Sequence, residues 1–302
     1  MTLLASISLY IGLGFFLVGS LLRVLQYSRM PIHLRWELYP VPGEGPKLAS
    51  HGGSYFEETD WWKHPRKKDL LNELRFMVFE ILLLRALWEF NRPLWWRSFP
   101  FHAGLYLLII ACLVSAAGAI GAQLSFAPTL FLVAKACAGI GLVLTLVGSI
   151  GLLLRRLTNK ELRNYTVPAD LLNVGGFALA SGLILAGALG GGMPPLRDTV
   201  YGLLTLSMGQ ELPFLAALGI VLGAAMVGYI PYTHMAHFIA KYFTYHLVRW
   251  DDAQKTKAME ARITQCLSYR PTWSAAHIDG QGKKSWGEIA TTNPASIERM
   301  PK

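Results

Sequence analysis

Histidines are concentrated where the last long apolar run of the chain ends, in the stretch IPYTHMAHFIAKYFTYH (residues 230–246). This stretch contains His234, His237 and His246, together with Lys241. Another histidine, His102, stands at the start of an earlier apolar run. Neutral imidazole is a ligand for haem iron, and helix bundles build such sites from side chains on facing helices. These residues therefore suggest a bis-imidazole haem site if the fold brings two of them together.

The composition is that of a membrane protein. Hydrophobic residues make up 53% of the chain and charged residues 16%, and the mean hydropathy is +0.36. A helix needs roughly 20 apolar residues to cross about 30 Å of hydrocarbon. Five blocks are long enough, at about 3–27, 101–122, 129–154, 169–190 and 212–240. We predict an all-α integral membrane protein with five transmembrane helices, formed by residues 1–250, followed by a cytoplasmic tail at 251–302.

The distribution of basic residues predicts the orientation. Of the 28 lysines and arginines, all but Arg23, Lys135 and Arg197 lie in three segments, residues 28–99, 155–167 and 238–302. Five spans would place these segments on one side of the membrane, and basic residues gather on the cytoplasmic side. We therefore predict that the N-terminus lies outside and the C-terminus lies in the cytoplasm.

The segment FMVFEILLLRALWEF (residues 76–90) competes for the role of a sixth span. It is short and carries Glu80, Arg85 and Glu89, which fits poorly with the length and charge limits of a spanning helix. Crossing here would also move the basic segment 155–167 outside. We predict instead a cytoplasmic interfacial helix at about residues 70–92.

Depth along the predicted spans pairs two of the histidines. The second span meets His102 soon after it leaves the cytoplasm, and the fifth span reaches His237 near its cytoplasmic end. Both imidazoles would therefore lie near the inner face, where they could bind one haem iron. Interfacial histidines that cap the last carbonyls of a helix are the alternative. His234, about 60° round the helix from His237, could replace it as the ligand, whereas His246 faces the opposite way.

The chain resembles the gamma subunit of respiratory nitrate reductase, a five-span cytochrome b. It is more similar still to the cytochrome b subunits of transmembrane redox complexes that contain a heterodisulfide-reductase-like iron–sulfur protein, including those linked to sulfite reduction. The resemblance covers roughly residues 1–252. It is carried by HLRWELYPVP (33–42), GGSYFEETDWW (52–62), RSFPFHAGLY (97–106) and PYTHMAHFIAKYFTYHLVRWDD (231–252).

The resemblance implies haem b ligated by His102 and His237, with Lys241 placed to pair with a haem propionate or to extend to the membrane surface. The second haem of the nitrate-reductase family does not carry over, because its ligand positions are occupied by Cys112 and Gly219. We therefore expect one haem; a second would need an unusual ligand such as Cys112 or Met226.

The resemblance also implies a quinone site. Lys135 corresponds to a lysine near the quinol site of the nitrate-reductase family. It could bind a quinone carbonyl or simply extend to the outer surface. Without an outer haem, the quinone site could lie at the inner face instead, near Arg35, Glu37 or His234.

The expected function is electron transfer between the menaquinone pool and a cytoplasmic heterodisulfide-reductase-like iron–sulfur subunit, within a quinol-linked oxidoreductase complex of anaerobic respiration. The location would be a bacterial or archaeal cytoplasmic membrane, with the lipid bilayer around the spans and no nucleic acid as partner. The chain has three cysteines but no CxxC motif, so an iron–sulfur cluster belongs to the partner. An extracytoplasmic cytochrome c is a further possible partner. The alternative is a cofactor-free membrane anchor for a redox enzyme; a small transporter is a third reading, although no repeated halves are visible.

Overall fold

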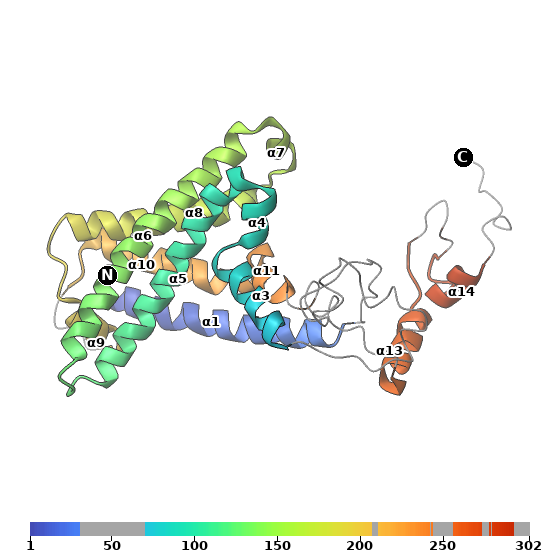
Figure 1. Cartoon of the computed structure of the whole chain (residues 1–302), viewed down its shortest axis with the longest axis horizontal. Coiled ribbons are helices and arrows are strands. Elements are labelled where there is room, and N and C mark those ends of the chain that lie inside the picture. The colour runs from blue at the N-terminus through green and yellow to red at the C-terminus, as the bar shows by residue number, and fades with distance from the viewer. Residues whose placement is uncertain are drawn as a thin grey trace. The chain divides into compact units, whose positions relative to one another are not determined.

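Five helices of the structure are long and apolar enough to cross a membrane (Figure 1). The structure, a computed structural model, describes residues 1–30, 70–206, 211–241, 243, 256–273, 278 and 280–292. Their contacts divide the chain into two units. One unit is Met1–Arg23 with Leu74–Phe238, and the other is Val24–Glu73 with Ile239–Lys302. The predicted boundary near residue 250 lies outside the described residues.

The spans follow the predicted apolar blocks. They are α1 (Thr2–Ser28), α5 (Arg92–Ile120), α6 (Ala127–Thr158), α8 (Pro168–Leu189) and a last span that begins with α10 (Phe214–Tyr229). The prediction of an all-helical chain with five helices able to span a membrane is confirmed. The side on which each terminus lies stays a prediction.

Small residues hold the spans together. A Cβ on Gly104 of α5 would overlap Thr145 of α6, and a Cβ on Gly12 of α1 would overlap the Ala224 carbonyl of α10. Such close backbone approach is typical of helix packing in membranes, where lipid tails are as apolar as the side chains they would replace. Large hydrophobic residues instead cover the outside of the bundle, including Leu113, Leu132 and Leu179. The exposed apolar surface is therefore suited to contact with lipid.

The segment predicted as one interfacial helix is two helices, α3 (Leu70–Leu82) and α4 (Arg85–Phe90), which are separated by a left-handed residue, Leu84, with φ of 51°. The last carbonyls of α3 are bonded by side chains of α5. Tyr106 donates its hydroxyl to the Ile81 carbonyl at 2.8 Å, and Trp95 donates its indole N–H to the Leu83 carbonyl at 2.8 Å. These bonds fix the end of α3 against α5.

The last span is interrupted, which corrects the prediction of one continuous helix from 212 to 240. Its α-helix ends at Tyr229 and is followed by two 3-10 turns, η3 (Ile230–Tyr232) and η4 (His234–Ala236), before α11 (His237–Lys241). Pro231 has no backbone N–H to continue the helical ladder, which explains the break. The extended residue Thr233 separates the two turns and caps the second by accepting a bond from Met235 N–H.

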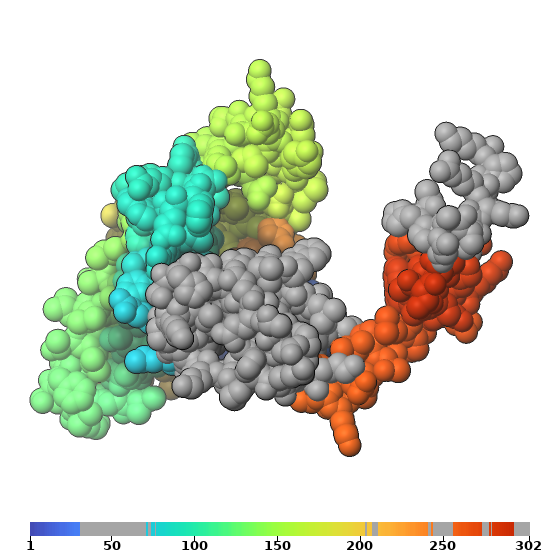
Figure 2. Space-filling view, turned by 45° about the vertical axis from the view of Figure 1, so that its right-hand side comes forward, coloured from blue at the N-terminus to red at the C-terminus, as the bar shows by residue number. Residues whose placement is uncertain are grey.

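The two ends of the bundle differ in character. At one end α6 runs into α7 (Lys160–Tyr165), which extends beyond α4 and the start of α5 (Figure 2). At the other end lies α9 (Leu196–Thr205), where Tyr201 donates its hydroxyl to the Ala119 carbonyl of α5 at 2.8 Å. His102, His234 and His237 lie toward the α7 end.

The C-terminal tail contains α13 (Lys257–Ser268) and α14 (Trp286–Thr291). The backbone N–H of Trp286 donates to the Tyr269 carbonyl at 2.9 Å, and the rings of Trp273 and Trp286 pack at 5.8 Å. The two tryptophans therefore pack on each other within the tail.

Candidate functional site

His102 lies well inside a span rather than at a helix end. Since α5 begins at Arg92, the histidine is about 15 Å along the helix axis. The expectation that the second span starts just before His102 is thus wrong, and the role of an end-capping histidine does not fit this residue. Its Nδ1 lies 2.7 Å from the Ser98 carbonyl oxygen one turn earlier. The Nδ1 proton is held there, which leaves Nε2 with the lone pair that a metal requires.

His237 lies next to His102, although the α-helix of its own span ends before it. The break after Tyr229 ends the α-helix, and the two 3-10 turns carry the chain to His237 at the first position of α11. The rings of His102 and His237 have their centres 6.2 Å apart and are inclined by 77°. The structure thus brings together the two residues that the sequence pairs.

The spacing of the two rings is suited to a shared metal. Bonds from a metal to imidazole nitrogen are about 2.0 Å long, and the nitrogen is about 1.1 Å from the ring centre, so two rings on opposite sides of one iron have centres about 6.2 Å apart. The observed separation of the ring centres, 6.2 Å, is compatible with two imidazoles on one metal. Imidazole is also the donor that b-type haem uses on both faces. The residues present therefore fit the group that the resemblance implies.

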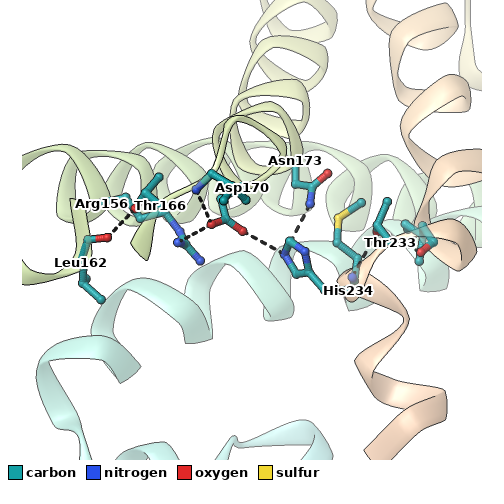
Figure 3. A network of polar contacts seen from close by, with 10 residues as sticks. Arg156, Leu162, Thr166, Asp170, Asn173, Thr233 and His234 are labelled. Atoms are coloured by element: carbon teal, nitrogen blue, oxygen red, sulfur yellow. Dashed lines mark hydrogen bonds and ion pairs between the residues drawn. The ribbon is translucent and has the colours of Figure 1, made fainter. Parts of the chain in front are cut away.

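His234 faces a polar network on the neighbouring helices (Figure 3). Its Nε2 lies 3.4 Å from the Asp170 Oδ1 and 3.4 Å from the Asn173 Nδ2, both on α8. The Asp170 Oδ2 in turn accepts a bond from Arg156 of α6 at 3.0 Å. His234 is therefore engaged with α8, and the structure does not place it as a substitute for His237.

Sequence reasoning missed Arg156, Asp170 and Asn173. One signal was available, because Asp170 is an acidic residue inside the apolar block 169–190, where a charge is costly unless it is paired. The partner of that charge, Arg156, is fourteen residues upstream of Asp170 in a different helix, so spacing along one helix does not reveal it.

Two further buried polar groups lie near His102. The hydroxyl oxygens of Thr145 and Ser149 on α6 have no hydrogen-bond partner among the described residues. Thr145 lies against Gly104, two residues beyond His102, and Gly148 lies against Phe101. Unpaired hydroxyls inside a protein are unusual, so this stretch of α6 offers hydrogen bonds at the depth of the histidine pair.

The residues predicted for a quinone are not brought together. Lys135 is exposed on α6, about 15 Å along the helix axis from Thr145 and hence from the level of His102. Arg35 and Glu37 lie outside the described residues. Lys241 ends α11, but its side chain is likewise outside what the structure describes.

The suggested ligands of a second haem are also separated. Cys112 is exposed on α5. Met226 is 4% exposed on α10, and a Cβ on Gly176 of α8 would overlap its sulfur. The thioether is therefore packed between α8 and α10, and the number of haems stays a prediction.

Comparison of the chain with models of known protein families, with curated proteins and with solved structures found no match. Within the part of the chain that the structure describes, no group of three or more His, Cys, Asp and Glu side chains could hold a metal ion. A haem needs only two protein ligands, since the porphyrin supplies the other four nitrogens. The case for the site therefore depends on the two imidazoles.

Proposed function

We propose that this chain is a haem b membrane subunit that passes electrons between the quinone pool and a cytoplasmic iron–sulfur partner. The observation that supports it best is the pairing of His102 with His237, whose ring centres lie 6.2 Å apart. The supporting detail is the bond from His102 Nδ1 to the Ser98 carbonyl, which keeps Nε2 available.

In this role the residues of the chain would hold the haem iron and orient the imidazole rings. His102 and His237 would bind the two faces of the iron, and Ser98 would fix the first ring through its carbonyl. When bound, haem b takes up and releases single electrons. A quinol that becomes a quinone gives up two electrons and two protons, so the electrons leave one after the other to the iron–sulfur partner, or return in the opposite direction.

The quinone and the protein partner belong to the same proposal. The basic end of the bundle, with Arg155, Arg156, Lys160 and Arg163, stands where a cytoplasmic partner would meet the membrane subunit. The segment 33–62, which carries the specific loop motifs, lies outside the described residues. Lys135 remains a candidate for the quinone, and an extracytoplasmic cytochrome c for the outer side.

Optical spectra of the purified chain test the proposal. We expect a reduced-minus-oxidised spectrum with a b-type α-band, which disappears in both His102→Ala and His237→Ala. His246→Ala is the matched control, since it removes an imidazole from the same C-terminal stretch of the sequence and should retain the band. Pyridine haemochrome per polypeptide then separates one haem from two. A wild-type protein without colour when produced with ample haem would refute the proposal and favour the cofactor-free anchor.

A further inference from the structure

The position of His237 needs an explanation, because the residue follows a break in its own span. After Tyr229 no α-helical ladder connects His237 to the rest of α10. The two 3-10 turns are closed by bonds such as Thr233 N–H to the Ile230 carbonyl and Ala236 N–H to the Thr233 carbonyl, whose geometry is poorer than that of an α-helix. Contacts from neighbouring helices therefore contribute to the position of this segment.

One such contact comes from α1. Arg23 donates from Nε to the Pro231 carbonyl oxygen at 2.9 Å. A Cβ on Gly19, one turn earlier, would overlap Pro231, so α1 also packs directly against the break. These contacts from α1 hold Pro231 in the first 3-10 turn. The second turn begins three residues later, at His234.

The second turn is held from α8 through His234 (Figure 3). Its Nε2 faces both Asp170 and Asn173 at 3.4 Å. The Oδ1 of Asn173 is buried without a partner in the orientation drawn. Rotation of the amide by 180° exchanges its oxygen and nitrogen. The Nε2–H of His234 can then be shared between the Asp170 carboxylate and the Asn173 oxygen, and the unpaired buried oxygen gains a donor.

The carboxylate that receives His234 is itself fixed. The Oδ2 of Asp170 accepts from Arg156 at 3.0 Å and from the Val167 backbone N–H at 3.2 Å. Its side chain is 12% exposed, and it lies in the first turn of α8, where a negative charge is favoured by the helix dipole. Asp170 is therefore fixed by contacts with α6 and within α8, and neither helix is part of the broken span.

We infer that Asp170 is a positioning residue for His237. It acts through His234, whose carbonyl oxygen accepts the backbone N–H of His237 and so links the tethered turn to the ligand. The inference rests on the proposed function, because it takes His237 as an iron ligand. Asp170 touches neither the iron nor the porphyrin in this assignment, and its effect is on where the second imidazole stands.

Titration of haem-free protein with hemin tests this inference. We expect Asp170→Asn to weaken hemin binding by about 10- to 100-fold, which is the usual effect of losing an outer partner of a metal ligand. The matched control is Asp198→Asn, since Asp198 is also an acidic residue in the first turn of a helix, α9, and should leave the affinity unchanged. His234→Gln tests the same tether from its other end, and Asp170→Glu should restore part of the affinity.

Low-spin EPR of the hemin-loaded protein separates positioning from simple destabilisation. The largest g-value depends on the angle between the two imidazole planes, so we expect it to move in Asp170→Asn and His234→Gln but not in Asp198→Asn. The double variant should be no worse than either single variant, because both remove one tether. Equal affinities and spectra for Asp170→Asn and Asp198→Asn would overturn the inference while leaving the haem assignment intact. Failure of the wild-type protein to bind hemin would instead overturn the proposed function, and the inference with it.

Discussion

The carbonyl oxygen of Ser98 lies 2.7 Å from the Nδ1 of His102, one helical turn away on the same span. Both residues lie inside α5, on either side of Pro100, and not at its end. This bond fixes the tautomer and the plane of the ring before any ligand is bound. The partner histidine, His237, instead stands at the first position of the short helix α11, after the break in its span.

Replacing Ser98 by Ala should leave the histidine pair intact. The stronger contact to His102 comes from the backbone oxygen, whereas the Ser98 hydroxyl lies farther away at 3.3 Å. We expect an unchanged α-band and unchanged hemin affinity in Ser98→Ala. A loss comparable to that of His102→Ala would show that the hydroxyl, and not the carbonyl, fixes the ring.

The contact between α5 and α6 predicts opposite effects for two glycine substitutions. A Cβ on Gly104 would overlap Thr145, so Gly104→Ala should lower stability by about 1–3 kcal/mol. Gly139 of α6 has open space around it, and Gly139→Ala should raise stability by up to about 1 kcal/mol, because alanine favours the helix. Thermal unfolding in detergent measures both, and equal effects at the two positions would contradict the packing described.

The ion pair between Arg156 and Asp170 should be detectable as a coupling energy. The two side chains are 33% and 12% exposed, so the pair is partly shielded from water. In a double-mutant cycle with Arg156→Gln and Asp170→Asn, we expect a coupling of about 1 kcal/mol in the free energy of unfolding. Purely additive effects would mean that the two helices are held together without this contact.

The predicted orientation can be measured by labelling from each side of the membrane. In a variant with Cys112, Cys137 and Cys266 replaced by serine, Lys160→Cys should react with a membrane-impermeant maleimide only from the cytoplasmic side. Asp198→Cys, at the opposite end of the bundle, should react only from outside. Labelling in the reverse sense would invert the topology and move the proposed partner to the other face.

The capping box of α14 predicts how the tail responds to acid. The backbone N–H and hydroxyl of Ser285 donate to Glu288 at 2.7 and 2.9 Å, which holds the pKa of its carboxyl below the usual value. Because the folded-state pKa is the lower one, the ionised carboxylate stabilises α14 above the ordinary pKa of glutamate. That contribution is lost as the pH falls through the lowered value. The protection factors for hydrogen exchange in α14, which are corrected for the intrinsic pH dependence of exchange, should therefore fall on acidification in the wild type. In Glu288→Gln they should be low and should not change through the same pH range.

The spans and the histidine pair could be predicted from the sequence because each depends on local signals. Apolar blocks of sufficient length determine the helices, and counting residues along antiparallel spans places His102 and His237 at one depth. The start of α5 at Arg92 was not predictable in the same way, since the residues that extend it are charged and aromatic rather than apolar.

The break in the last span and the tether of His234 are harder to predict. Pro231 signals a disturbance, but a proline can also be tolerated as a kink within a membrane helix. The contacts that the interrupted segment makes with Arg23 and Asp170 come from helices distant in the sequence. Asn173 is equally hard to predict, because its contact with His234 forms only when α8 packs against the last span.

The bond between Arg23 and Pro231 joins the first span to the last. During synthesis the first span enters the bilayer long before the segment that it must meet has left the ribosome. The two imidazoles therefore have no common location until the last span has been made. In the proposed function, an iron held by both of them would be bound only after that point, so loading with haem would follow insertion of the fifth span.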